Sequence, residues 1–494
     1  MSTTQFLALD LGAESGRGVL GTLDGKRLQL EDVHRFPNGP VRVLSSMHWD
    51  VLRLFSEMKK ALSLAAAQAG RSLAGVGVDT WGVDFGLLGS GDVLLGNPYH
   101  YRDERTVGMV DEACRRVPRE GIFERTGIQF MELNTVYQLL AMTVAKSPLL
   151  DLAEVLLMMP DLLNFWLTGV KVSEFSIATT SQFYDPRLGD WSRELLTELG
   201  IPTHFLPKIV PPGAVLGDLL ESIAEETGAG GVKVVAPACH DTGSAVAAVP
   251  ASTPDYAYIS SGTWSLMGIE SKEPIIGPEA LRFNFTNEGG VCGTFRFLKN
   301  IMGLWLIQEC RRTWAGRGDE YTYEQLTNLA EDAPPFQALV EPDDPLFLRP
   351  ADMPARIRQF CEHTDQDPPH EHGAILRCAL ESLALKYRWV LERLEELLGR
   401  RLEVVHIVGG GSQNHLLNQF AADAMNRPVI TGPVEATAIG NILMQAIALG
   451  HLSSLDEARE VVRSSFEVKT YEPELPEQWD EPYQRYLSLS GLAG

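Results

Sequence analysis

Short apolar runs alternate with segments of helical periodicity along this chain, which predicts an α/β protein. In the first half, residues 6–11, 17–23 and 76–79 have the length and apolar character of buried strands. Apolar side chains recur with helical spacing over residues 51–69 and 153–167, and a glycine, the usual helix stop, follows the second segment. The pattern therefore predicts strands and helices in alternation, as in folds built around a sheet.

The second half opens in the same way as the first. Residues 256–260 and 264–270 are predicted as two strands about a tight glycine turn, and the chain itself begins with strand, turn and strand. A chain of 494 residues is also too long for one core. We therefore predict a duplicated α/β domain that joins near residues 251–255, with one domain over 1–250 and the other over 251–494.

Further along, a long amphipathic helix is predicted over 374–398 and a strand over 404–408. A glycine turn at 409–411 follows, with Ser412 as the expected cap of a helix over about 414–424. The last well-patterned helix covers residues 441–449, and the acidic tail from Glu472 is poorly patterned.

Composition and charge narrow the class of protein. The hydrophobic fraction of 45% and the charged fraction of 22% are ordinary for a globular protein. The net charge of −23 argues against nucleic acid and anionic membrane surfaces as partners. No apolar run approaches a membrane span, and the N-terminus lacks the basic start of a signal peptide, so we expect a cytoplasmic protein.

The six cysteines contain no C-x-x-C pair, which argues against a zinc site or a disulfide framework. Cys361 and Cys378 are close enough in sequence that the sequence does not exclude a disulfide between them. The histidines between His363 and His372 lie in a predicted loop, where no rigid element sets a metal-ligand geometry.

The first chemical motif follows the first strand and runs from Asp10 to Arg17. A carboxylate at the end of a buried strand is costly unless a hydrogen bond or a cation compensates it, and hydrated magnesium is one such cation. Gly12 and Gly16 permit close approach of a phosphate, and Ser15 and Arg17 offer donors. A plain hairpin turn, with Asp10 accepting from backbone amides, remains the alternative.

Two commoner nucleotide signatures are missing from the sequence. No G-x-x-x-x-G-K-[ST] run is present, which argues against a P-loop fold. The triple glycine at 409–411 lies between a strand and a helix but lacks the spacing of a dinucleotide fingerprint. It is interpreted as a turn against which adenine or ribose lies, with simple loop punctuation as the alternative.

The second motif is His240-Asp241-Thr242, which follows an apolar strand over 232–236. A sugar hydroxyl is a poor nucleophile, and a carboxylate that accepts its proton would act as a general base. An aspartate is suited to phosphoryl transfer, where positioning and charge stabilisation do most of the work. A turn built from Asp and Gly is the alternative.

Together these motifs identify the chain as a member of the FGGY carbohydrate kinase family, which it resembles over nearly its whole length. The resemblance rests on residues 10–17, 79–85, 101–103, 240–242, 260–268, 299–305, 406–414 and 432–436. It implies two ribonuclease-H-like (actin-like ATPase) domains flanking a catalytic cleft. The first domain would bind the sugar and the second the nucleotide.

The resemblance also implies roles for individual residues. Asp241 would accept the proton, and the sugar would contact His240, Asp241, Thr242, the backbone of Gly82 and Asn300. ATP would contact Ala13, Glu14, Ser15, Gly16, Arg17, Thr263, Gln308 and Gly410. Asp10 would meet Mg²⁺ through water. No direct contact is assigned to the Glu14 carboxylate, because it would repel the phosphates, and the turn has Gly-Ala-Glu where many sugar kinases have Gly-Thr.

The activity that the resemblance implies is ATP-dependent phosphorylation of L-rhamnulose at its 1-hydroxyl, and we expect a monomer or a small homo-oligomer. L-Fuculose and L-xylulose remain open as substrates, because one hydroxyl's stereochemistry separates such sugars. An actin- or chaperone-like ATPase is the alternative from another class. It would need a partner-binding domain or a polymer interface, and the two predicted domains use the whole chain.

Overall fold

The computed structural model describes residues 3–70 and 73–492. Within that part of the chain the fold divides into two compact units. The first unit is made of Met1–Pro250, Glu270–Leu298 and Glu435–Phe466, and the second of Ala251–Ile269, Lys299–Val434 and Glu467–Gly494. Two segments of the second half of the chain are therefore built into the first unit.

A six-stranded sheet forms the centre of the first unit. Its strands, in spatial order, are β13 (Ala214–Asp218), β14 (Lys233–Ala236), β6 (Leu73–Thr80), β1 (Thr4–Leu11), β2 (Ser15–Leu23) and β3 (Leu28–Pro37). β1 is antiparallel to β2 and parallel to β6, which is in turn parallel to β14. The carboxyl ends of β1, β6 and β14 consequently meet at one edge of the sheet.

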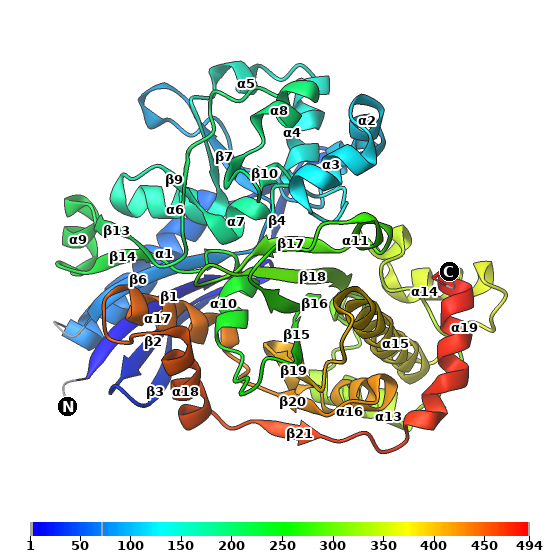
Figure 1. Cartoon of the computed structure of the whole chain (residues 1–494). Coiled ribbons are helices and arrows are strands. Elements are labelled where there is room, and N and C mark those ends of the chain that lie inside the picture. The colour runs from blue at the N-terminus through cyan, green and yellow to red at the C-terminus, as the bar shows by residue number, and fades with distance from the viewer. Residues whose placement is uncertain (1–2, 71–72, 493–494) are drawn as a thin grey trace. The chain divides into compact units, whose positions relative to one another are not determined.

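The second unit repeats this arrangement. Its strands are β15 (Tyr256–Ser261), β16 (Trp264–Ser271), β19 (Val404–Val408), β20 (Val429–Thr431) and β21 (Lys469–Tyr471). β15 is antiparallel to β16 and parallel to β19, as β1 is to β2 and β6. The mixed α/β fold with two similar strand–turn–strand openings is thus confirmed, and its two main sheets are visible in Figure 1.

The remaining elements connect and cover these strands. In the first unit they are β4 (Pro40–Val43), β5 (Ser46–Trp49), α1 (Val51–Ala69), β7 (Phe85–Leu88), α2 (Met109–Arg116), α3 (Arg119–Thr126), α4 (Thr135–Val144), α5 (Pro148–Leu152), β8 (Val155–Met158), α6 (Met159–Thr168), β9 (Val172–Glu174), α7 (Phe175–Thr179), β10 (Tyr184–Asp185), β11 (Asp190–Trp191), α8 (Arg193–Glu198), β12 (Lys208–Val210), α9 (Glu221–Thr227), α10 (Asp241–Ala247), α11 (Pro278–Arg282), β17 (Thr286–Gly289), α17 (Ala436–Ala448) and α18 (Leu455–Ser465). β18 (Phe295–Met302) crosses the division and, with β17, belongs to the second main sheet, next to β16. In the second unit they are α12 (Trp305–Ala315), α13 (Tyr323–Asp332), α14 (Met353–His363), α15 (His372–Leu398), α16 (His415–Met425) and α19 (Asp480–Ser490).

Helices α1 and α17 cover opposite faces of the first sheet. A Cβ atom at Gly18 of β2 would lie 2.7 Å from Ala61 of α1, and one at Gly21 would lie 2.7 Å from Ile442 of α17. Residues three apart on a strand point to opposite faces, so the two helices enclose the sheet between them. Figure 1 shows α17 beside β1 and β6 and next to α10.

Gly440 allows α17 to pack closely against α10, the helix that begins at Asp241. A Cβ atom there would lie 1.8 Å from the backbone oxygen of Ser244. We expect Gly440→Ala to lower the free energy of unfolding by about 1–3 kcal/mol, because the backbone must move to admit the methyl group. Denaturant unfolding measures the loss.

Gly121→Ala is the matched control for that measurement. Gly121 is also helical, but its added Cβ would meet only Val117, at an ordinary 3.7 Å. This variant should be unchanged or more stable by up to about 1 kcal/mol, because alanine has the higher helix propensity. Equal stability of the two variants would contradict the close packing of α10 and α17.

The structure corrects several predicted elements. The helix expected over residues 153–167 is in fact strand β8 followed by α6, because a short apolar run does not distinguish strand from helix, and Pro160 stands at the start of α6. The predicted stop is confirmed, since Gly169 has a left-handed φ of 77°. The poorly patterned tail nevertheless contains helix α19, whose Tyr483 and Tyr486 are buried.

The cap predicted for α16 is also wrong. Asn414, and not Ser412, accepts the hydrogen bond from the helix, at 3.0 Å from Leu417 N, while the Ser412 hydroxyl donates to Gly409 O. Cys361 and Cys378 are buried free thiols. Among the described helices, none is long and apolar enough to cross a membrane.

Candidate active site

Three carboxylates gather where the parallel strands of the first unit end. Asp10 near the end of β1 is the register partner of Asp79 in β6. Thr80 at the end of β6 bridges to His240, so that Asp241, at the start of α10, follows at the same edge. Sequence patterns placed each carboxylate after a strand, and the parallel pairing brings all three to one edge.

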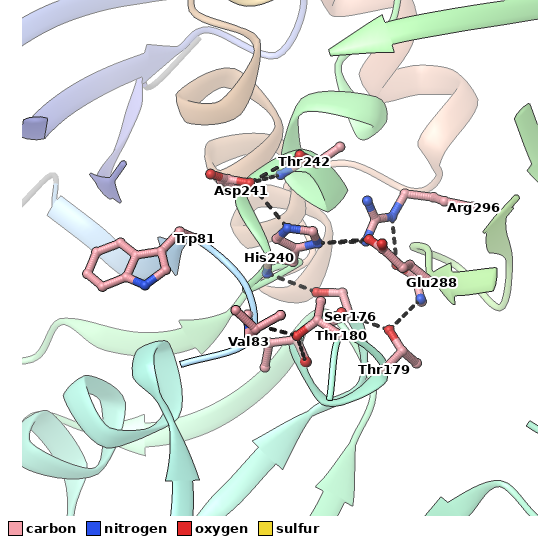
Figure 2. Close-up of polar contacts among 12 residues, drawn as sticks. Trp81, Val83, Ser176, Thr179, Thr180, His240, Asp241, Thr242, Glu288 and Arg296 are labelled. Atoms are coloured by element: carbon pink, nitrogen blue, oxygen red, sulfur yellow. Dashed lines mark hydrogen bonds and ion pairs between the residues drawn. The ribbon is translucent and has the colours of Figure 1, made fainter. Parts of the chain in front are cut away.

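Helix α7 and the residue after it hold the loops of this site in place. Glu174 caps α7 and also accepts from the backbone N–H of Cys239 at 3.0 Å. The Ser176 hydroxyl oxygen accepts from the His240 N–H at 3.0 Å, and the Thr180 hydroxyl accepts from Val83 N–H at 3.0 Å. Figure 2 shows the last two of these contacts around His240. The backbones of two separate loops are thus fixed by one short helix.

Gly82 lies next to His240 in this arrangement. A Cβ atom at Gly82 would lie 3.4 Å from His240 Nε2 and 3.2 Å from the Thr180 methyl. The following residue, Val83, is held at a left-handed φ of 67°, a strained conformation for a β-branched side chain. Such strain persists only where the surroundings impose it, and it is found disproportionately at functional sites.

The Asp241 carboxylate is partly exposed and is held by its neighbours. Its Oδ1 accepts from Thr242 N–H at 2.5 Å and from the Thr242 hydroxyl at 3.1 Å, and lies 3.5 Å from His240 Nε2. Its side chain is 30% exposed. Burial, and secondarily the charge of Asp10, raise the pKa of this carboxyl, whereas His240 lowers it. A carboxylate with a raised pKa and an exposed face is suited to accept a proton.

Two residues that sequence reasoning missed contact His240 from the strand pair β17 and β18. Glu288 Oε2 lies 3.2 Å and Arg296 Nη2 lies 3.0 Å from His240 Nδ1. The two side chains lie directly opposite each other in the antiparallel pair, and Figure 2 shows both beside the imidazole. They are about 50 positions from His240, and no local pattern pointed to them.

Arg17, near the start of β2, links Asp10 of β1 to a third missed residue, Glu435. Its guanidinium donates to Asp10 Oδ2 from Nε at 2.9 Å and from Nη2 at 2.7 Å, and Nη1 pairs with Glu435. Although burial opposes the charge, these two carboxylates raise the pKa of Arg17. Glu435 belongs to a segment that carried the family resemblance, but nothing in the sequence indicated its partner. The Arg17 guanidinium, which lies just after the turn between β1 and β2, is therefore already neutralised by the carboxylates of Asp10 and Glu435.

Asp79 is the most deeply buried of the three carboxylates. Its Oδ2 accepts from Asn441 of α17 at 2.5 Å, and its Oδ1 accepts no hydrogen bond from any described residue. Burial, followed by the charge of Asp10, raises its pKa well above the usual value. The sequence showed a carboxylate at a strand end here but assigned it no role.

This raised pKa makes the stability depend on pH in a definite direction. Above the unfolded value of 3.8, the unfolded chain loses the Asp79 proton while the folded chain keeps it, so the free energy of unfolding falls as pH rises. Asp79→Asn removes this loss. We expect the variant's stability advantage over the parent to widen from about pH 4 to about pH 7, as measured by urea unfolding.

Asp24→Asn supplies a control of opposite sign. Backbone donors at Arg27 and Lys26 lower the pKa of the exposed Asp24 carboxyl, so its stabilising effect is present above pH 3.8 and is lost in acid. Any difference between this variant and the parent should therefore close as pH falls. If the difference in free energy of unfolding between Asp79→Asn and the parent became smaller as pH rises, the raised pKa of Asp79 would be contradicted.

The remaining predicted site residues lie in the second unit. Thr263 is in the turn between β15 and β16, where its carbonyl accepts from Gly303 N–H and Trp305 N–H, both at 3.2 Å. Gly410 follows β19 at the same sheet edge and is exposed, and a Cβ atom added there would have no neighbour within 4 Å. Gln308 lies on α12 with a buried Oε1 that has no partner among the described residues, and Asn300 is half-buried on β18.

The glycine turn is packed tightly against the end of β15. A Cβ atom at Gly411 would lie 2.0 Å from the Ser261 hydroxyl, and Gly409 has a φ of 86°. These two positions require glycine. Gly410 does not, because no atom lies within 4 Å of the place of an added Cβ, and this side of the turn is open. The predicted nucleotide set is thus divided between the units, with residues 13–17 in the first and Thr263, Gln308 and Gly410 in the second.

The part of the chain that the structure describes contains no group of three or more His, Cys, Asp or Glu side chains arranged to hold a metal ion. Asp10 and the unpartnered Asp79 Oδ1 nevertheless lie at one edge, and carboxylate oxygens suit Mg²⁺. Magnesium commonly uses one or two carboxylates together with water and substrate phosphate. The donor set fits an ion held in that way.

Comparisons with known proteins agree over nearly the whole chain. Residues 5–248 match the N-terminal domain, and residues 257–449 the C-terminal domain, of the FGGY family of carbohydrate kinases. A rhamnulokinase of Bacteroides thetaiotaomicron is 45% identical over 478 residues, which cover 97% of this chain and 98% of that protein. One of Enterococcus faecalis is 39% identical over 491 residues, or 99% of this chain and 98% of that protein.

Solved structures share the fold at much lower identity. A gluconate kinase from Lactobacillus acidophilus superposes with a TM-score of 0.80 at 18% identity, over 99% of this chain and 98% of that one. A xylulose kinase from the same organism gives a TM-score of 0.79 at 18% identity, over 99% of each chain.

Proposed function

Because the chain belongs to the FGGY family of carbohydrate kinases, we propose that it phosphorylates L-rhamnulose at the 1-hydroxyl, with ATP as the donor. The observation that carries the substrate is the agreement of relatives: seven proteins that are 37–45% identical over 94–99% of this chain are all rhamnulokinases. Kinases of this family use ATP. The products are L-rhamnulose 1-phosphate and ADP.

Asp241 accepts the proton of the attacking hydroxyl in this proposal. Its partly exposed carboxylate and its raised pKa support the role, because a more basic carboxylate takes a proton more readily. The sugar contacts His240, Thr242 and the backbone of Gly82, which the structure brings together around Asp241. Asn300 of the second unit is a further sugar contact.

ATP is held by Ala13 and Glu14 of the turn after β1, by Ser15, Gly16 and Arg17 at the start of β2, and by Thr263, Gln308 and Gly410. The unpartnered Oε1 of Gln308 and the open face of Gly410 support these assignments, since both are unused within the described chain. Glu14 contributes backbone and not its carboxylate. Arg17 acts mainly by neutralising Asp10 and Glu435, which would otherwise repel the phosphates.

Mg²⁺ is held through water by Asp10, with Asp79 beside it. When bound, the ion neutralises charge on the transferring phosphoryl group and on the Asp10 carboxylate. We further propose that residues 1–250 and 251–494 serve as the sugar-binding and nucleotide-binding lobes. The enzyme acts in the cytoplasm, where ATP is available, as a monomer or a small homo-oligomer.

A panel of ketoses tests the substrate assignment. ADP formation is measured with L-rhamnulose, L-fuculose and L-xylulose, and kcat/KM is compared at saturating ATP and magnesium. We expect L-rhamnulose to give the highest value, by about tenfold or more, since a misplaced hydroxyl that leaves a buried polar group unpaired costs more than 1 kcal/mol. A higher kcat/KM for L-fuculose or L-xylulose would assign the enzyme to that sugar instead.

A further inference from the structure

We propose that Arg296, neutralised by Glu288, is a positioning residue that fixes the proton of His240 on Nε2 and so aims an N–H at the reacting carboxylate. The inference rests on the proposed function in one respect, namely that His240 and Asp241 meet the sugar. It adds a reason for the position of the proton on the His240 ring.

Strand register, a backbone hydrogen bond and burial hold this pair in place. Glu288 of β17 and Arg296 of β18 are direct register partners, and Arg296 Nε also donates to Gly289 O at 2.8 Å. Arg296 is fully buried and Glu288 is 4% exposed. A buried guanidinium needs a carboxylate nearby, and Glu288 Oε2 lies 3.2 Å from Arg296 Nη2.

The chemistry of the guanidinium decides which ring nitrogen carries the proton. An arginine side chain only donates hydrogen bonds and stays protonated. Arg296 Nη2 lies 3.0 Å from His240 Nδ1, so Nδ1 must present its lone pair. In a neutral imidazole the proton then belongs to Nε2. The competing arrangement, with Nδ1–H donating to Glu288 at 3.2 Å, would place two donors against each other.

The consequence appears at Asp241. His240 Nε2 lies 3.5 Å from Asp241 Oδ1. An N–H directed at this oxygen keeps Asp241 ionised and oriented until a sugar hydroxyl approaches. With the proton on Nδ1, the Nε2 lone pair would face the carboxylate and repel it. Arg296 therefore acts on the base through His240 without touching the sugar.

Nitrogen-15 NMR of the ligand-free protein with labelled histidine tests the proton position directly. His240→Gln identifies the His240 signals among the 11 histidines by their loss. The expected spectrum shows a protonated Nε2 and an unprotonated Nδ1 for this residue. A protonated Nδ1 would overturn the proposal. Because no sugar is present, this result does not depend on which ketose, or whether any, is the substrate.

A double variant tests the role of the pair without leaving a buried charge. Glu288→Met with Arg296→Met removes both ionic groups, an exchange that folds tolerate far better than loss of one partner. Thermal unfolding checks that it remains folded. We expect His240 to lose its single tautomer and kcat to fall about 10- to 100-fold, as is usual when a residue that orients a reactive group is lost, with a much smaller change in the sugar KM.

The conservative variant completes the set. Arg296→Lys keeps one charged donor beside Nδ1 and should restore the Nε2–H tautomer and part of kcat. An unchanged tautomer and kcat in the double variant would contradict the proposal, as would a rise in sugar KM alone. If the ketose panel fails but the tautomer behaves as expected, the proposed function is wrong and the positioning of His240 stands.

Discussion

Asp241→Asn should lower kcat for L-rhamnulose by about 10²–10⁴-fold and leave the Kd for ATP unchanged. Asparagine can still accept from Thr242 N–H, so the turn at the start of α10 keeps its shape, but the amide cannot take the proton of the 1-hydroxyl. That hydroxyl is a poor nucleophile without a base. Steady-state ADP formation gives kcat, and calorimetry with ATP gives the Kd.

The control is Asp218→Asn in strand β13, which is paired with β14, the strand that leads to the site. Asp218 forms an exposed ion pair with Lys233, so its loss should leave kcat within about twofold of the parent. If Asp241→Asn retained more than about a tenth of the parent kcat, Asp241 would not be the base. A matching loss of ATP binding would indicate misfolding instead.

Arg17→Met should have the second large effect, on ATP binding and on stability together. Its guanidinium is the common partner of Asp10 and Glu435, and its side chain is only 17% exposed. Removing one member of a buried ion pair costs on the order of 3 kcal/mol, because the other member is left uncompensated. We expect the Kd for ATP to rise about 10- to 100-fold, since two freed carboxylates then face the phosphates.

Arg35→Met on the neighbouring strand β3 is the matched control. Arg35 pairs with Asp32 at the surface, and its side chain is 54% exposed. Surface pairs contribute roughly 0–1 kcal/mol, so neither ATP binding nor stability should change much. Equal effects of the two substitutions on the Kd would show that Arg17 matters only as general positive charge. Titration calorimetry and urea unfolding measure both quantities.

Local patterning was enough to predict much of the fold. Residues 6–11 form the fully buried part of β1, and the helix expected over 51–69 and the strand over 404–408 have the observed bounds. These elements have a clear period or a continuous apolar run bounded by turn residues. The prediction for segment 153–167 failed because five apolar residues before a proline suit a strand as well as a helix.

The site could be predicted only where a motif is continuous in sequence. His240, Asp241 and Thr242 are adjacent in sequence. In the structure Gly82 lies beside His240 and packs against Thr180. Partners that arrive from distant strands and helices left no local signal. Arg296 meets His240 through the pairing of β17 and β18, and Asn441 reaches Asp79 from α17.

The same limit explains the state of Asp79 and Arg17. Sequence reasoning identified a carboxylate at a strand end and an arginine at the start of the strand that follows a glycine turn. Asp79 differs from an ordinary aspartate because parallel pairing sets Asp10 beside it and α17 covers it. Arg17 is already neutralised because Glu435 comes from a segment 418 positions away (435 minus 17). Both properties arise from tertiary contacts.

Phosphorus NMR of the complete reaction tests the central claim most directly, namely that Asp241 promotes phosphoryl transfer from ATP to the sugar. ATP, magnesium and L-rhamnulose are incubated with the parent enzyme and with Asp241→Asn. The account predicts one new phosphomonoester signal, split by the two protons of C1, that grows in step with ADP and is almost absent with the variant. Inorganic phosphate that accumulates at the same rate with and without sugar would contradict it and indicate an actin- or chaperone-like ATPase.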